Sequence, residues 1–83
     1  MTADEMFETL GYSKRVLKEG NYIEYGHTSE NPREYYIIAF EKLDHTISIS
    51  LYSFTKGKIE SKDLIITLEE LKAINKKVEE LGW

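Results

Sequence analysis

The chain has 83 residues, of which 41% are hydrophobic and 31% are charged, a composition typical of one folded domain. It contains no cysteine, which excludes both disulfides and thiolate zinc sites. The net charge of −4 opposes the phosphates of nucleic acids and anionic membrane surfaces, so we expect neither as a partner. We interpret residues 1–83 as a single domain.

The start of the chain indicates where the protein resides. Residues 1–6 are acidic and contain no apolar run, so they do not resemble a signal peptide. No segment approaches the roughly 20 apolar residues that span a bilayer. We therefore expect a cytoplasmic protein.

Residues 2–10 are predicted to form a short helix. Thr2 and Glu5 have the spacing of a capping box, and Gly11 stands where helices commonly end. Four apolar residues at helical spacing make one face: Ala3, Met6, Phe7 and Leu10.

Residues 12–27 are predicted to form a β-hairpin that turns at residues 19–21. The returning strand places Ile23 and Tyr25 on one face. The register of the first strand stays open, because either of two adjacent residues can face inward, Val16 or Leu17. A polar loop is expected over residues 27–33, which contain the only proline.

Residues 34–54 are predicted to form a second, longer hairpin, because they are rich in strand-forming residues and alternate in polarity. If Glu41 pairs with Thr46, one face holds Tyr36, Ile38, Phe40, Ile47, Ile49 and Leu51. The opposite face then holds Tyr35, Ile37, Ala39 and Tyr52.

The last third of the chain is expected to end in a helix. Residues 55–58 read as a turn, and residues 64–66 as a short strand. Thr67 and Glu70 form a second capping box, in which we expect Thr67 to contribute more to stability than Glu70. The apolar stripe of this helix is predicted to face Ile47, Ile49 and Leu51, and it consists of Leu71, Ile74, Val78 and Leu81. Gly82 ends the helix, and Trp83 is placed to fold back onto the sheet.

No residue pattern points to chemistry. His27 and His45 both fall in predicted loops and lack a second ligand at a recognised spacing. The carboxylates sit at helix starts and on polar helix faces, where capping and solvation explain them. Lys56-Gly57-Lys58 lacks the frame of a phosphate-binding loop. We therefore predict no catalytic residue, no metal site and no cofactor.

The tyrosines are the one feature of the sequence that suggests a functional surface. There are six in the chain, and tyrosine is enriched at interfaces. Either the first helix or a loop covers the second sheet face, or that face is an exposed patch that binds a partner. On the second reading, the candidate interaction surface is centred on Tyr35, Ile37 and Tyr52.

Several stretches resemble small proteins of unassigned activity that phages and prophages of low-GC Gram-positive bacteria encode. The matching stretches are Met6-Phe7-Glu8, Leu10-Gly11-Tyr12, Ile23-Glu24-Tyr25, residues 66–77 (ITLEELKAINKK) and Glu80-Leu81-Gly82-Trp83. The resemblance covers both predicted helices and the first hairpin, and leaves out residues 27–63. It implies expression inside a bacterial cell that carries a phage, and it assigns no functional residue.

The predicted fold is α+β, an antiparallel sheet of four to five strands with a short N-terminal helix and a longer C-terminal helix packed on one face. The predicted function is that of a non-enzymatic accessory protein that binds a host or phage protein, or a second copy of itself. The alternative is a small enzyme or enzyme subunit, whose site is assembled across an oligomer from loop histidines and carboxylates. A pocket that joins both histidines to a carboxylate would favour the enzyme.

Overall fold

The computed structural model describes residues 1–28, 34–55, 58–61 and 65–83, and the side chains of 1–28, 34–52 and 65–83. The fold is α+β, as predicted. Its elements in chain order are α1 (Ala3–Thr9), β1 (Ser13–Leu17), a 3-10 turn (Lys18–Gly20), β2 (Tyr22–Thr28), β3 (Glu34–Glu41), β4 (Thr46–Thr55), β5 (Lys58–Ser61) and α2 (Leu68–Leu81).

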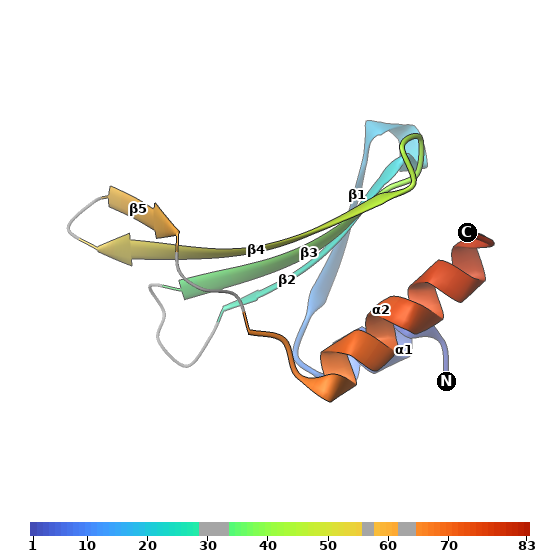
Figure 1. Cartoon of the computed structure of the whole chain (residues 1–83), viewed down its shortest axis with the longest axis horizontal. Helices are drawn as coiled ribbons and strands as arrows, with labels where there is room; N and C mark the ends of the chain where they lie inside the picture. The colour runs from blue at the N-terminus through green and yellow to red at the C-terminus, as the bar shows by residue number, and fades with distance from the viewer. Residues whose placement is uncertain (29–33, 56–57, 62–64) are drawn as a thin grey trace.

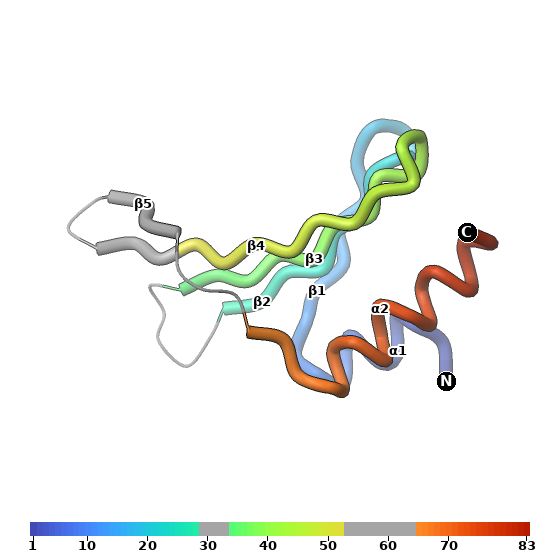
Figure 2. The backbone as a smooth tube through the Cα atoms, in the orientation of Figure 1, coloured from blue at the N-terminus to red at the C-terminus, as the bar shows by residue number. Residues whose placement is uncertain are grey.

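The strands form one antiparallel five-stranded sheet in which each strand pairs with its neighbour in sequence, in the order β1-β2-β3-β4-β5. Figure 2 shows how this meander curves along its length. Glu41 pairs with Thr46, so the predicted register of the second hairpin is correct. In the first hairpin Val16 pairs with Ile23, which puts Val16 rather than Leu17 on the core side of the sheet.

Both helices lie on the same side of the sheet, with α1 beside α2 (Figure 1). The buried core joins this side of the sheet to both helices, and consists of Phe7, Tyr12, Ile23, Tyr25, Ile38, Phe40, Ala73 and Ile74. The aromatic ring of Phe7 stacks on that of Tyr25 with 4.0 Å between centroids. We call the other side, which carries Tyr35 and Tyr52, the far face.

The capping residues are placed as the sequence predicts. The hydroxyl oxygen of Thr2 accepts from the backbone N–H of Glu5, and that of Thr67 accepts from the N–H of Glu70. In both pairs the glutamate returns a bond to the cap backbone. Gly82 ends α2 with φ of 73°, a conformation that glycine adopts without strain.

The position of α2 differs from the prediction. Ile74 is buried, and Val78 and Leu81 pack against the core together with Ile49. Leu71 and Ile47 instead remain 41% and 37% exposed. α1 lies on the same side of the sheet and packs against α2, so the two helices share one core with Ile38 and Phe40 of β3, and Ile47 of β4 stays partly exposed.

Further expectations can be compared with the structure. His27 lies within β2 rather than in a loop, because the strand continues to Thr28. Residues 65–66 of the predicted strand 64–66 are not in a strand, and residue 64 lies outside the described residues. Of the predicted turn at 55–58, Thr55 ends β4 and Lys58 begins β5. Residues 29–33 of the predicted loop and residues 56–57 of that turn lie outside the described residues. Trp83 does fold back, with its ring 6.3 Å from that of Phe40.

Candidate functional site

The predicted interaction surface lies on the far face. Tyr35 of β3 and Tyr52 of β4 are directly opposite each other in the register, and they are 36% and 38% exposed. Ile37 is half-buried beside them. Neither α1 nor α2 covers this side of the sheet (Figure 1). The three residues therefore share one face that the described helices leave uncovered.

The ring of Tyr35 rests on the neighbouring strand because residue 26 is a glycine. A Cβ built at Gly26 would lie 2.9 Å from Cζ of Tyr35, closer than real contacts allow. Gly26 itself is buried. The absence of a side chain at this position thus lets the Tyr35 ring lie against β2, while 36% of the residue stays exposed.

A charged pair adjoins the tyrosines on the far face. Glu24 of β2 is 5% exposed, and its Oε1 accepts from Nη2 of Arg15 at 2.7 Å and from Nε at 3.2 Å. The Arg15 side chain is 67% exposed. A buried carboxylate therefore holds an accessible guanidinium beside Tyr35, and tyrosine and arginine are the residues most enriched at interface hot spots.

His27 lines a pocket on the helix side of the sheet. The pocket has a volume of about 200 Å³ and is bordered by Leu10, Tyr12, His27, Thr67 and Glu70. The imidazole stacks on Tyr36 at 5.0 Å and meets the edge of Tyr12 at 4.4 Å. Nδ1 lies 2.9 Å from the carbonyl oxygen of Thr28. Since a carbonyl only accepts, Nδ1 is the donor in this contact.

Glu70 is the carboxylate of this pocket, and both of its oxygens are engaged. Oε1 accepts from the backbone N–H of Thr67 at 2.7 Å, and Oε2 accepts from the hydroxyl of Tyr12. Burial raises the pKa of the Glu70 carboxyl, but these hydrogen bonds outweigh it and hold the pKa below its ordinary value. Burial and the bond to Glu70 raise the pKa of Tyr12. Glu70 thereby joins the start of α2 to Tyr12.

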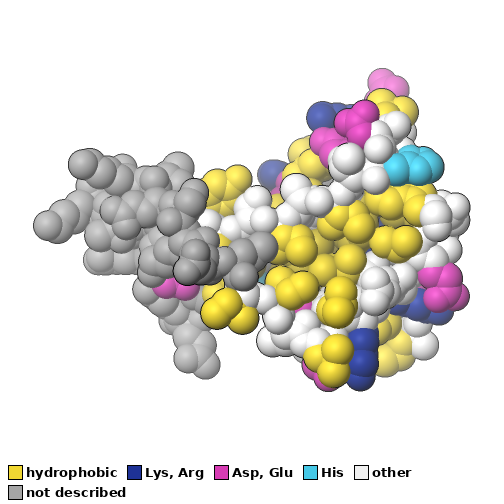
Figure 3. Space-filling model, in the orientation of Figure 1, with side chains coloured by type: hydrophobic (Ala, Val, Ile, Leu, Met, Phe, Trp, Pro, Cys, Tyr) yellow, Lys and Arg dark blue, Asp and Glu magenta, His cyan; other side chains and the backbone are white. Residues whose placement is uncertain are grey.

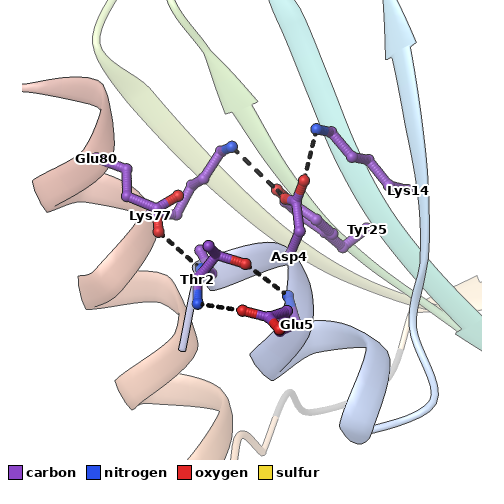
Figure 4. A network of polar contacts seen from close by, with 8 residues as sticks. Thr2, Asp4, Glu5, Lys14, Tyr25, Lys77 and Glu80 are labelled. Atoms are coloured by element: carbon purple, nitrogen blue, oxygen red, sulfur yellow. Dashed lines mark hydrogen bonds and ion pairs between the residues drawn. The ribbon is translucent and has the colours of Figure 1, made fainter.

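A second polar network ties α1 to the rest of the domain (Figure 4). Asp4 accepts from Nζ of Lys14 at 2.8 Å and from the hydroxyl of Tyr25 at 2.6 Å. The ammonium of Lys77, whose residue is 7% exposed, lies 3.7 Å from the same carboxylate. The backbone N–H of Ala3 donates to Glu80 at 2.8 Å. These contacts join α1 to β1, β2 and α2.

The two histidines lie in separate surroundings. His45 sits in the turn between β3 and β4 and stacks on Trp83 at 4.9 Å, whereas His27 contacts Tyr12 and Tyr36. The His27 pocket does not include His45. Within the described parts of the chain, no three histidine, aspartate or glutamate side chains are grouped as a metal site would require.

Sequence reasoning missed the position of His27 in the pocket, the bond of Glu70 to Tyr12 and the pairing of Glu24 with Arg15. A signal existed for His27, because it continues the alternation of Ile23 and Tyr25 onto the core side. The second role of Glu70 had no local signal, since its partner Tyr12 is 58 positions away. For Glu24 the signal is its place opposite Arg15 in the first hairpin, once the register is known.

Comparisons with known proteins give no further guide to the site. Among the described helices, none combines the length and apolar character that crossing a membrane would need. The chain matches no protein-family model, no curated protein and no solved structure.

Proposed function

We propose that this domain is a non-enzymatic binding protein, and that the far face is where it contacts a partner protein. The supporting observation is the Tyr35–Tyr52 pair, in which two cross-strand tyrosines remain 36% and 38% exposed on a face that neither helix covers. Burying such rings contributes about 25 cal/mol per Å² of apolar area. Contact with a partner would therefore stabilise the far face more than contact with water does.

The far face is also prepared for binding. The Tyr35 ring lies against Gly26, and Arg15 forms an ion pair with Glu24. These two side chains therefore lose little conformational freedom when a partner binds. We propose a phage or host protein as the partner, in keeping with the sequence resemblance. An enzyme assembled from loop histidines has less support, because His27 lies in a strand and both oxygens of Glu70 already accept hydrogen bonds.

A photo-crosslinking residue placed at position 35 or 52 tests this proposal in bacterial cells. We expect a discrete adduct with one protein from both positions. The matched control is position 72 on α2, where the Lys72 side chain is 56% exposed on the other side of the molecule. Adducts that form equally from position 72, or none from 35 and 52, would contradict the proposal.

A second variant tests the position of the tyrosine ring. Gly26→Ala displaces the Tyr35 ring without altering its chemistry, so we expect the crosslink from position 52 to weaken while the fold persists. Circular dichroism monitors the fold. With the crosslinking residue at position 52, the variant Tyr35→Glu should abolish the adduct with the same protein.

A further inference from the structure

The far face carries its charged side chains toward one end. By the strand register, and among the described side chains of β1 to β4, those facing this way are Arg15, Glu24 and Glu41. Lys18 of the 3-10 turn joins them, because its Nζ lies 3.3 Å from Oε1 of Glu41 and 5.5 Å from the centroid of the Tyr22 ring. Figure 3 shows basic and acidic side chains close together at the end of the sheet where Figure 1 places the hairpin turns.

The cations of this group are directed outward and the carboxylates inward. The side chains of Arg15 and Lys18 are 67% and 64% exposed, whereas those of Glu24 and Glu41 are 6% and 28% exposed. The four formal charges cancel, so the net charge of −4 lies elsewhere in the chain. A molecule that approaches the far face therefore meets accessible cations, while the rest of the protein is acidic on balance.

Tyrosine rings lie beside both cations, and β2 sets their order. The successive far-face residues of β2 are Tyr22, Glu24 and Gly26. Glu24 binds Arg15, and the Tyr35 ring lies against Gly26. Glu24 raises the pKa of the Arg15 guanidinium, and Tyr35 and Tyr22 add to this effect, so both rings lie within electrostatic range of it. Tyrosines and cations thus alternate along the far face. We call this set the cationic row, and it consists of Tyr35, Arg15, Tyr22 and Lys18.

We propose that the far face binds an extended acidic segment of the partner protein, whose carboxylates contact the two cations of the cationic row and whose apolar side chains contact its two tyrosines. This inference rests on the proposed function and adds the chemical class of the partner. Alternate residues along β2 are about 7 Å apart, and alternate side chains of an extended segment repeat at the same spacing. An extended segment can therefore place its side chains in step with the row.

The guanidinium of Arg15 is suited to a second carboxylate. Glu24 engages Nε and Nη2, which are two of the three nitrogens that carry its five N–H groups. The outer side of the guanidinium thus retains donors, and a planar guanidinium binds carboxylates in a defined geometry. The buried Glu24 carboxylate holds the group in place before the partner binds, which lowers the entropy cost of binding.

Charge distinguishes an acidic segment from a nucleic acid as the occupant. A nucleic acid is a long polyanion, so the net charge of −4 repels it along its length, and two exposed cations neutralise few of its phosphates. A short acidic segment has few charges, and the same two cations neutralise them. Repulsion from the acidic remainder of the protein also disfavours other docking positions, so it directs the segment to the far face.

Chemical-shift mapping of the full chain by NMR provides the test. The probe is a short synthetic peptide of glutamate and glycine with one leucine, and the matched peptide carries lysine in place of glutamate. We expect the acidic peptide to shift amide signals next to the cationic row, and the lysine peptide to leave them unchanged. High salt should weaken the binding, because it screens exposed charges.

Two variants remove the cations without leaving a buried charge. Arg15→Gln/Glu24→Gln replaces the ion pair by a neutral pair, since Arg15→Gln alone would leave the Glu24 carboxylate buried without its partner. Lys18→Asn removes the second cation, and asparagine tolerates the φ of 52° at this position. We expect the double variant to weaken binding of the acidic peptide at least about fivefold, and Lys18→Asn at least about twofold. The matched control, Lys72→Gln on α2, should bind like the wild type.

Three results would overturn the proposal. They are an acidic peptide that shifts no signal of the far face, a short oligothymidylate that binds there more tightly than the acidic peptide, and full affinity in Arg15→Gln/Glu24→Gln. If that variant does not fold, full affinity in Lys18→Asn has the same meaning. Crosslinks from positions 35 and 52 without a response to the acidic peptide would remove only the acidic partner. A response to the peptide without those crosslinks would instead contradict the proposed function.

Discussion

The hydroxyl of Tyr12 donates a hydrogen bond to the carboxylate of Glu70, and this buried pair links residues 58 positions apart. Tyr12 follows α1, and Glu70 lies in the first turn of α2, where it also caps the helix. One carboxylate thus accepts a hydrogen bond from the backbone at the start of α2 and another from the segment that follows α1. Tyr25 of the same core likewise donates its hydroxyl to a carboxylate, that of Asp4.

Removing the Tyr12 hydroxyl should destabilise the domain. Tyr12→Phe leaves an oxygen of Glu70, which is 9% exposed, without its buried donor, and we expect a loss of about 1–3 kcal/mol. Urea unfolding measures the change. Tyr36→Phe is the control, because the Tyr36 ring stacks on His27 and its hydroxyl has no hydrogen bond to a described side chain. Equal losses in both variants would mean that the bond to Glu70 contributes little.

Stability should fall in acid, with Glu70 as one cause. Its folded-state pKa lies below the ordinary value, so its contribution is complete above about pH 5 and is lost as the pH falls through the folded-state pKa. Glu70→Gln removes this contribution, and we expect a shallower loss of unfolding free energy between about pH 5 and pH 3. Asp4, whose pKa is also lowered, keeps part of the slope. Identical slopes in the two proteins would exclude Glu70 as a cause.

Two apolar residues of α2 should differ sharply in their contribution. Ile74 is 5% exposed, so Ile74→Ala removes core packing and should cost about 2–5 kcal/mol. Leu71 is 41% exposed, and Leu71→Ala should cost less than about 1 kcal/mol. Thermal melting at low protein concentration compares them. A larger loss for Leu71→Ala would contradict the observed position of α2.

The second capping box gives a further contrast. Thr67→Ala deprives the N–H of Glu70 of its acceptor and should cost about 0.5–2 kcal/mol. The sequence alone suggested a smaller effect for Glu70→Ala. The structure reverses that order, because Glu70 also accepts from Tyr12. Chemical denaturation of both variants decides the order, and a milder Glu70→Ala would restore the simple capping interpretation.

The second hairpin could be predicted from the sequence, and its register was assumed rather than derived. A four-residue turn at 42–45 suggested the pairing of Glu41 with Thr46 as an assumption, and the structure has this pairing. The capping boxes were clear, because their signals lie within four residues. The tyrosine face followed from the alternation of this hairpin.

The placement of α2 could not be predicted in the same way. A helical stripe limits which residues face inward, but it does not say which strands they meet. That choice depends on α1, whose Phe7 stacks on Tyr25 and occupies the β2 side of the core. The stacking of Phe7 on Tyr25 and the hydrogen bond between Tyr12 and Glu70 both join segments that are far apart in the sequence. No local sequence pattern predicts either contact.

The meander order of the sheet also bears on how the chain folds. Each hairpin closes a short loop, whereas the packing of α1 against α2 closes nearly the whole chain, and this closure costs more entropy. We therefore expect the strands to pair before the helices dock. The apolar side of the sheet on which the helices pack is then still exposed to water. The single tryptophan, stacked on His45, reports that docking step by its fluorescence. Folding speed would then be limited by the meeting of the first and last helices.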